Sequence, residues 1–328
     1  MANRQRLYDW SLLLFCNMVW GSQFVVYKIV QRQSGPVFAA LFPITIATLL
    51  LAPIVLRVRA KSGGNARLAA GASAGSKTLH HPFWHFVLIG VAGQVVTQTF
   101  VAGGVRYTLA SNAALLGLGL PIFTAIMAYL LLGERMTAVR WLSFALALAG
   151  VVECSGIAWG QVNFASSKYL IGNLLLFFAM NASAFYNTYS KRLMRIYSPL
   201  EVLFRSYCVV VVVMLPIAIL TEPRTFASIP HFAPAVWLCF LILGVFQYFL
   251  AMLAFLDVLT RLDATQAGLS NYLISFFGLI TAFVVLHEHL TIPMVAGGML
   301  VLASTLLVTL YEGRQSNRPA LDSVPAQK

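Results

Sequence analysis

The chain alternates between long apolar runs and short polar segments. Ten of the runs are long enough to cross a bilayer as a helix, which takes about 20 predominantly apolar residues. They predict transmembrane helices at residues 10–30, 36–56, 84–106, 108–132, 138–158, 169–190, 199–220, 234–259, 263–286 and 291–311. Because most connecting segments are short, consecutive helices are expected to be antiparallel neighbours. The pattern therefore predicts an all-α integral membrane protein of about ten transmembrane helices.

The composition excludes a soluble globular protein. Hydrophobic residues make up 59% of the 328 residues and charged residues only 10%, whereas soluble domains average roughly 45 to 50% and 25%. The predicted spans leave no room for a large soluble domain. The sequence contains no nucleotide-binding motif, so we expect neither an ATP-driven pump nor a bound cofactor.

Two polar segments interrupt or end the series of helices. Residues 57–83 are rich in Gly, Ala and Ser and carry five Lys or Arg residues, which predicts a flexible basic loop in the cytoplasm. Residues 312–328 are mostly polar and are expected to form a disordered cytoplasmic tail.

The basic residues set the predicted orientation. The chain has a formal net charge of +12, but its Lys and Arg residues lie between apolar runs and not along one polar face. This distribution predicts contact with a lipid bilayer and no nucleic-acid partner. If the N-terminus is cytoplasmic, 16 of the 22 basic residues face the cytoplasm, five face outside and Arg205 falls inside a span. The positive-inside rule then predicts a multi-pass protein of the cell (inner) membrane with both termini in the cytoplasm.

The two halves of the chain resemble each other. Residues 110–149 align without a gap onto residues 264–303 at an offset of 154, which pairs Ala110 with Ala264 and Glu134 with Glu288. A unit of five helices has an odd number of spans, so the second copy enters the membrane in the opposite orientation. We therefore predict two inverted repeats, at residues 1–158 and 169–311, with a substrate site at their interface near the midplane.

Four short motifs resemble those of a known family. They are Trp20-Gly21-Ser22 followed by Phe24 and Lys28, Tyr107-Thr108-x-Ala110-Ser111-Asn112-Ala113, Pro121-x-Phe123-Thr124, and Leu132-Gly133-Glu134. With the duplication, they resemble the EamA-type transporters of the drug/metabolite transporter superfamily over residues 9–311. The resemblance implies a ten-helix bundle that exports or exchanges amino acids or similar small metabolites through a central cavity. The second copy departs from the first at Ser275, which replaces the proline, and at His287, which replaces the glycine.

Polar and aromatic side chains at mid-helix depth are the candidates for the lining of such a cavity. A polar side chain in hydrocarbon is costly unless it pairs or faces water. At a rise of about 1.5 Å per residue, Gln94, Asn181 and Gln247 lie near the midplane of their spans. The full set of candidates for substrate binding is Trp20, Gln23, Gln94, Gln98, Asn181, Arg205, Gln247, Tyr248 and Asn271. Alternatively, these groups form hydrogen bonds between helices and hold the bundle together.

Arg205 allows two interpretations. It lies six residues after Pro199, so its guanidinium can extend to the membrane surface or pair with Glu201 four residues earlier. Alternatively, it captures a carboxylate of the substrate, because the guanidinium fork matches a carboxylate geometrically.

Three more residues are candidates for holding or moving helices. Glu134 and Glu288 occupy matched positions just beyond their helices, where they are predicted to bind helix ends or adjacent backbone donors, or alternatively to latch gates. Pro121 removes the backbone hydrogen bond to Gly117 and is expected to kink its helix, which would provide a hinge.

The competing class of function is a membrane-embedded enzyme, for instance a metal-dependent hydrolase. Its support is the sequence His287-Glu288-His289. Adjacent residues of a helix point about 100° apart, unlike two histidines at i and i+4 that share one face. We therefore predict no metal site there and no enzymatic activity.

The predicted orientation is testable by cysteine labelling. In a cysteine-free variant, a single cysteine within residues 63–76 should resist an impermeant thiol reagent added to intact cells, because the charge asymmetry places this segment in the cytoplasm. A single cysteine at Asn163 should react, because that segment is predicted to face outside. Labelling of the first position and protection of the second would reverse the orientation.

Overall fold

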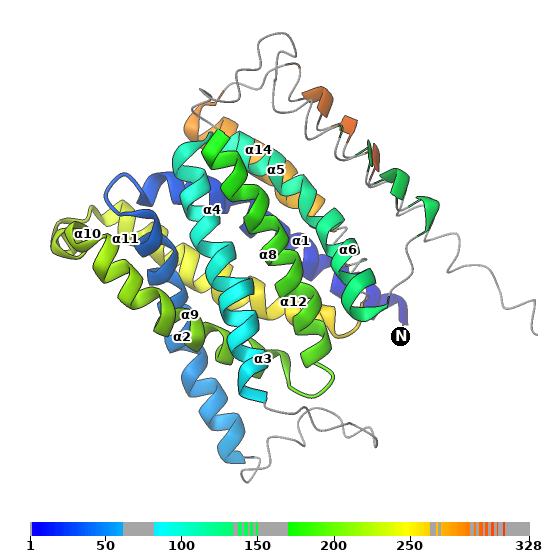
Figure 1. Ribbon diagram of the computed structural model, residues 1–328, viewed down its shortest axis with the longest axis horizontal. Helices are drawn as coiled ribbons and strands as arrows, with labels where there is room; N and C mark the ends of the chain where they lie inside the picture. Colours follow the sequence, from blue (N-terminus) through cyan, green and yellow to red (C-terminus); the bar gives the residue numbers. More distant parts are fainter. Residues whose placement is uncertain are drawn as a thin grey trace, which may run out of the picture.

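The computed structural model describes residues 2–61, 82–133, 170–262 and 270–288, together with residue 267 and scattered positions within 137–149 and 292–311. Every regular element within these residues is helical (Figure 1). In chain order the elements are α1 (Ala2–Val30), α2 (Pro36–Lys61), α3 (Pro82–Leu88), η1 (Ile89–Val95), α4 (Val96–Tyr107), α5 (Ala110–Leu116), η2 (Gly117–Gly119), α6 (Leu120–Leu132), α8 (Leu170–Leu193), α9 (Pro199–Thr221), α10 (Pro223–Ser228), η3 (Ile229–His231), α11 (Pro234–Leu241), η4 (Ile242–Ala251), α12 (Met252–Leu259) and α14 (Tyr272–Leu286). The elements η1 and η4 are π-helices, whereas η2 and η3 are 3₁₀ turns.

The described helices agree with the predicted spans, except that two helices are longer than predicted and two short elements were not predicted. Helix α1 begins at Ala2 and α2 continues to Lys61, so both extend beyond their apolar runs. The short elements α10 and η3 are not predicted, because a helical turn of six or fewer residues leaves no apolar run in the sequence. The predicted spans at 138–158 and 291–311 have only scattered described positions, and most of the loop at 57–83 and the whole tail at 312–328 lie outside the described residues.

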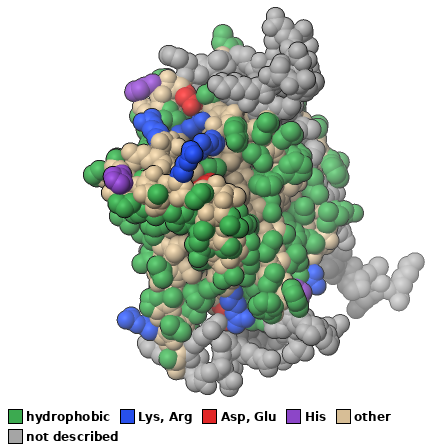
Figure 2. Space-filling model, turned by 60° about the vertical axis from the view of Figure 1, so that its left-hand side comes forward, with side chains coloured by type: hydrophobic (Ala, Val, Ile, Leu, Met, Phe, Trp, Pro, Cys, Tyr) green, Lys and Arg blue, Asp and Glu red, His purple; other side chains and the backbone are tan. Residues whose placement is uncertain are grey.

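The outer surface of the bundle is apolar at mid-height. By length and composition, five described helices could cross a membrane, at Leu7–Val30, Pro36–Val58, Phe83–Tyr107, Pro199–Thr221 and Pro234–Leu259. Figure 2 shows a broad band of hydrophobic side chains on one face, with Lys and Arg gathered toward its two ends. The protein is therefore an all-α integral membrane protein, because only a lipid environment leaves such a surface favourable.

The packing of the helices follows an inverted repeat. Helix α1, the first of the first repeat, packs against α14 of the second, and α8, the first of the second repeat, packs against α6 of the first. In the same way α4 packs against α8, while η4 and α12 pack against α1 (Figure 1). Each of these contacts between the repeats thus has a counterpart in which the roles of the two repeats are exchanged.

Glycines let two pairs of helices approach to backbone contact. A Cβ atom added to Gly21 of α1 would lie 2.7 Å from the carbonyl oxygen of Ile274 in α14. A Cβ atom on Gly172 of α8 would lie 2.8 Å from the carbonyl oxygen of Gly104 in α4. Larger residues at these positions would push the helices apart, since neither backbone can move aside.

At one end of the bundle, two glutamates bind the first turns of helices from distant parts of the chain. The Glu222 carboxylate accepts hydrogen bonds from the backbone N–H groups of Val37 (2.8 Å) and Phe38 (2.9 Å) at the start of α2. The Glu288 carboxylate accepts from Ala110 (3.2 Å) and Ser111 (2.9 Å) at the start of α5. First-turn N–H groups lack partners within their own helix and carry partial positive charge, so a carboxylate stabilises them. We call this the glutamate end.

The ends of α6 and α14 also show how similar the two repeats are. Gly133 after α6 and His287 after α14, which are 154 residues apart, both adopt the left-handed conformation, with φ of 72° and 54°. The backbone N–H of each donates to the matched carbonyl, of Ala128 or of Ala282. The second repeat thus keeps the helix ending of the first although histidine replaces glycine. Glu134, the counterpart of Glu288, lies outside the described residues.

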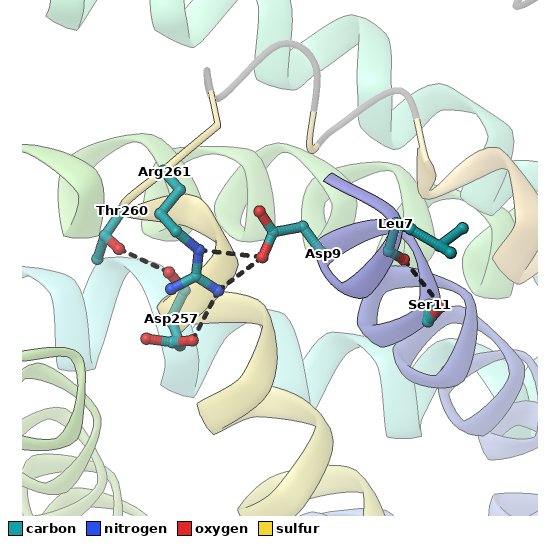
Figure 3. Close-up of polar contacts among 6 residues, drawn as sticks. All are labelled: Leu7, Asp9, Ser11, Asp257, Thr260 and Arg261. Carbon is teal, nitrogen blue, oxygen red and sulfur yellow. Dashed lines mark hydrogen bonds and ion pairs between the residues drawn. The ribbon is translucent and has the colours of Figure 1, made fainter. Parts of the chain in front are cut away.

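The opposite end of the bundle is held by an ion cluster (Figure 3). The guanidinium of Arg261, just after α12, donates to Asp9 of α1 (Nε, 3.0 Å) and to Asp257 one turn earlier (2.8 Å). The Asp257 hydrogen bond is the main reason that the pKa of Arg261 lies above its ordinary value, and Asp9 adds to the effect. Next to this cluster, Lys191 of α8 donates to the carbonyl oxygen of Leu262 at 2.7 Å. We call Arg261, Asp9 and Asp257 the Arg261 cluster.

The glutamate end yields a prediction for stability. Glu222→Gln and Glu288→Gln should each lower the free energy of unfolding by about 1 kcal/mol, the usual cost of losing a good N-terminal cap. Each substitution removes the charge and one of two accepting oxygens. Thermal melts of the purified protein in detergent measure the effect.

Arg224→Gln serves as the matched control, because this exposed residue lies in the same segment and also loses one charge. Equal melting temperatures for Glu222→Gln, Glu288→Gln and Arg224→Gln would contradict the capping role. If the glutamates are caps only, the folded variants should still transport.

Candidate functional site

A cavity lies at the centre of the bundle, between helices of both repeats. Its empty space, with the open mouth included, is about 690 Å³. The first repeat contributes residues of α1, α4, η2 and α6, and the second contributes residues of α8, η4, α12, α14 and the turn before α14. The cavity therefore lies at the interface of the repeats, as predicted for the substrate site.

Helices depart from regular α geometry next to the cavity. The π-helix η4 carries Gln247 and Tyr248, and the 3₁₀ turn η2 begins at Gly117; all three residues border the cavity. In the second repeat, the turn at Asn271 interrupts the helix at the residue that matches Gly117, and Ile274 matches Leu120. Irregular helical segments in a membrane are common at functional sites, because a cavity can satisfy the backbone groups that they leave unpaired.

Tyrosines and glutamines form a hydrogen-bond chain along one wall. The hydroxyl of Tyr248 donates to the side-chain oxygen of Gln98 at 2.8 Å, and the Gln98 amide donates to Gln94 at 3.0 Å. Tyr248 also shares a hydrogen bond with the hydroxyl of Tyr27 in α1. On a second wall, the amide of Gln247 donates to the side-chain oxygen of Gln23. These bonds connect both repeats and fix the orientation of the polar groups at the cavity.

Six of the nine predicted binding residues border the cavity. They are Trp20, Gln23, Gln98, Gln247, Tyr248 and Asn271. The ring of Trp20 is oriented edge-on to Phe255, with the centroids 5.0 Å apart. The structure thus brings together candidates from α1, α4, η4 and the turn before α14.

Gln94 and Asn181 do not border the cavity, contrary to the prediction. Gln94 is 2% exposed and accepts the hydrogen bond of Gln98 from within η1, one turn farther from the space. The Asn181 amide donates to the carbonyl oxygen of Phe177 in its own helix at 2.9 Å. Both residues were selected by their depth in the membrane, which places a residue along its helix but does not decide which face of the helix it occupies.

Arg205 is also placed away from the cavity. Its guanidinium pairs with Glu201 and lies over the rings of Phe86 and Tyr197, at 4.8 and 5.1 Å from their centroids. These contacts match the first of the two interpretations, in which Arg205 pairs with Glu201 near the membrane surface. Capture of a substrate carboxylate by Arg205 would require these contacts to break.

Pro121 and Glu288 have positions that bear on their predicted roles. Pro121 stands in the first turn of α6, directly after the 3₁₀ turn η2, so the helix is irregular where the proline predicts a kink.

Both carboxylate oxygens of Glu288 are bound to backbone N–H groups. This glutamate is the centre of the His287-Glu288-His289 sequence, and its contacts are those of a helix cap.

Two polar residues of the lining, Ser183 and Asn187 of α8, are not among the candidates predicted from the sequence. A helical signal was available: Met180, Ser183 and Asn187 are spaced at i, i+3 and i+7, which places them on one face of the helix. Thr97 of α4 also borders the cavity, and it shares a face with Gln98 and Val101. Periodicity along a helix was therefore more informative than depth.

The lining is uncharged wherever the structure describes it. It carries no Asp, Glu, Lys or Arg side chain; its polar groups are carboxamides and hydroxyls, together with the Trp20 indole. The apolar part is formed by Phe24, Val101, Leu120, Met180, Met252 and Ile274. Such a lining suits a small solute without net charge that has both polar and apolar parts.

The fold is that of a solved structure. A chain whose printed title is "Crystal structure of protein" superimposes with a TM-score of 0.67 at 18% sequence identity, covering 94% of this chain and 99% of that chain. This similarity concerns the fold alone.

Curated relatives are transporters by name. The chain is 26% identical over 301 residues to an uncharacterized transporter of Archaeoglobus fulgidus, with 91% of this chain and 96% of the relative covered. It is 25% identical over 313 residues to a probable terminal-alkyne amino-acid exporter of Streptantibioticus cattleyicolor, with 94% and 97% covered. The model of the EamA-like transporter family matches twice, at residues 10–155 and 170–310. With both halves matched and both contributing to the cavity, the chain belongs to the EamA-like transporter family.

Proposed function

We propose that this protein is a secondary transporter that exports or exchanges small organic metabolites, with amino acids or related zwitterions as its substrates. The central cavity is the substrate site. Trp20, Gln98, Gln247 and Tyr248 are its main polar and aromatic contacts. The protein acts without a cofactor.

The observation that carries the proposal is an uncharged cavity built by both repeats where their helices are irregular. A transporter that works by alternating access needs a site that each repeat helps to form, because relative motion of the repeats then opens the site to either side. The similarity to a probable amino-acid exporter supports an amino acid as the substrate. The carboxamides of the lining can bind ammonium and carboxylate groups alike.

The two ends of the bundle supply contacts that such motion would alternately break. The glutamate end fixes α2 and α5 through Glu222 and Glu288, and the Arg261 cluster joins α1 to α12 at the other end. We propose that residues 1–158 and 169–311 act as the two moving units, with the Arg261 cluster on the cytoplasmic side of the cell membrane. The basic residues near that end, including Lys191 and Arg192, support this orientation.

Substitution of a lining glutamine tests the proposal. Gln247→Leu should weaken substrate binding about 5- to 150-fold, because a polar group of the substrate then loses its partner at a cost of about 1 to 3 kcal/mol. Thermal-shift titration with a panel of amino acids, followed by uptake into proteoliposomes, measures binding and transport.

Asn181→Leu is the matched control, since it makes the same kind of change at a residue that does not border the cavity. It should leave affinity unchanged and lower stability slightly, by about 0.6 kcal/mol on average for a hydrogen bond in a membrane protein. Affinity that is intact in Gln247→Leu, or equally reduced in both variants, would refute the cavity as the substrate site.

A further inference from the structure

We propose that Asn271 binds the head group of the substrate, and that the substrate is an α-amino acid with a free ammonium group, a free carboxylate and an apolar side chain. The inference rests on the proposed transport function and adds a class of substrate to it. It comes from the position of a buried carboxamide without hydrogen-bond partners at the edge of an uncharged cavity.

The side chain of Asn271 lacks hydrogen-bond partners although it is completely buried. The residue is 0% exposed, and within the described part of the chain neither its amide nitrogen nor its carbonyl oxygen has a partner. A buried polar group without a partner costs free energy, so such groups are rare in native proteins and call for an explanation. Because Asn271 borders the cavity, a bound solute can supply the missing partners.

The usual structural role of asparagine at this position is not used. Asn271 directly precedes α14, where its side chain would ordinarily cap the first turn, but it makes no such hydrogen bond. Its backbone is in the ordinary right-handed region (φ −64°, ψ −11°), so no special conformation requires an asparagine. Gly117, the matched residue of the first repeat, lies at a comparable irregularity without any side chain. The helix ending therefore does not explain the carboxamide.

A carboxamide is complementary to the head group of an amino acid. It presents an N–H donor and a carbonyl acceptor side by side. A zwitterion presents a carboxylate that accepts and an ammonium that donates, both bonded to the same carbon. Asn271 can therefore satisfy both of its groups with one ligand, and hydrogen bonds to charged partners are stronger than those between neutral groups.

The rest of the lining selects an apolar side chain. Trp20, Phe24, Leu120 and Ile274 give the cavity an apolar wall. Among the described lining residues there is no charge to pair with an acidic or basic side chain. An amino acid such as glutamate or lysine would thus bury an unpaired charge, which is strongly unfavourable.

The test compares free and blocked forms of one amino acid on the purified full-length protein. Leucine, methionine, phenylalanine, tryptophan, glutamate and lysine are first ranked by thermal-shift titration. We expect an apolar amino acid to bind best, and its amide and its N-acetyl derivative, each lacking one charged group, to bind at least about 10-fold more weakly. Asn271→Leu should weaken binding of the free amino acid about 5- to 150-fold and remove most of the preference over the blocked forms.

Three further variants separate recognition from folding. Asn271→Leu should keep or raise the melting temperature, because it removes two unpaired polar atoms. Asn271→Gly, which installs the residue found at the matched position, provides a second variant if the leucine does not fit. Ser275→Ala is the matched control, since Ser275 also has a buried hydroxyl without a described partner but does not border the cavity; its affinity should not change. Gln247→Leu tests the cavity independently of Asn271.

The possible results distinguish a failure of the Asn271 inference from a failure of the proposed function. If Gln247→Leu loses affinity while Asn271→Leu and Asn271→Gly keep it, or if blocked amino acids bind as well as free ones, Asn271 does not recognise the head group and only this inference fails. If glutamate or lysine binds best, the proposed class of side chain is wrong. If no amino acid binds the wild-type protein, or if Gln247→Leu binds normally, the proposed function fails and this inference with it.

Discussion

Hydrocarbon offers no hydrogen-bonding partner to a backbone N–H or carbonyl group, and this constraint governs the architecture of the protein. Helices that face lipid must remain regular, whereas irregular segments need another source of partners. The π-helix η4, the 3₁₀ turn η2 and the turn at Asn271 all have residues at the cavity. The π-helix η1, in contrast, has no residue at the cavity and packs against α8 and α9. Irregular backbone in the described spans thus occurs both at the cavity and between packed helices.

The two repeats share a backbone plan but differ in chemistry at matched positions. Gly133 and His287 end their helices in the same left-handed conformation, so the geometry of the ending persists through a change of side chain. At the cavity the difference is greater, because Gly117 of one repeat corresponds to Asn271 of the other, and both residues border the cavity. An inverted repeat alone would produce a symmetric site that binds both ends of a solute equally. Substitutions at matched positions remove this symmetry from the lining.

The sequence predicted much of the fold because transmembrane helices have a strong local signal. Apolar length located the described spans, and the offset of 154 residues located the repeat. Contacts between distant segments were harder to predict: the partner of Glu222, at the start of α2, is 185 residues away, and no local pattern indicates it. At the cavity, residue type and depth selected Gln98 and Gln247, which border it, but also Asn181, which does not. Its neighbour Asn187 was recognisable only from the helical face that it shares with Ser183.

The crossing of α4 and α8 and the contact of α1 with α12 are counterparts in the two repeats, yet different forces hold them. At Gly104 and Gly172 the backbones touch, and dispersion forces between uncharged atoms dominate. At Arg261 the contact depends on the ion pair with Asp9 of α1, whose side chain is 5% exposed, while Asp257, which is 50% exposed, pairs with Arg261 within the same segment. Mobile ions screen partly exposed pairs over a Debye length of about 8 Å at physiological ionic strength. Salt therefore weakens mainly the Asp257 pair, whereas the buried Asp9 pair that joins α1 to Arg261 depends on ionic strength almost as little as the glycine crossing does.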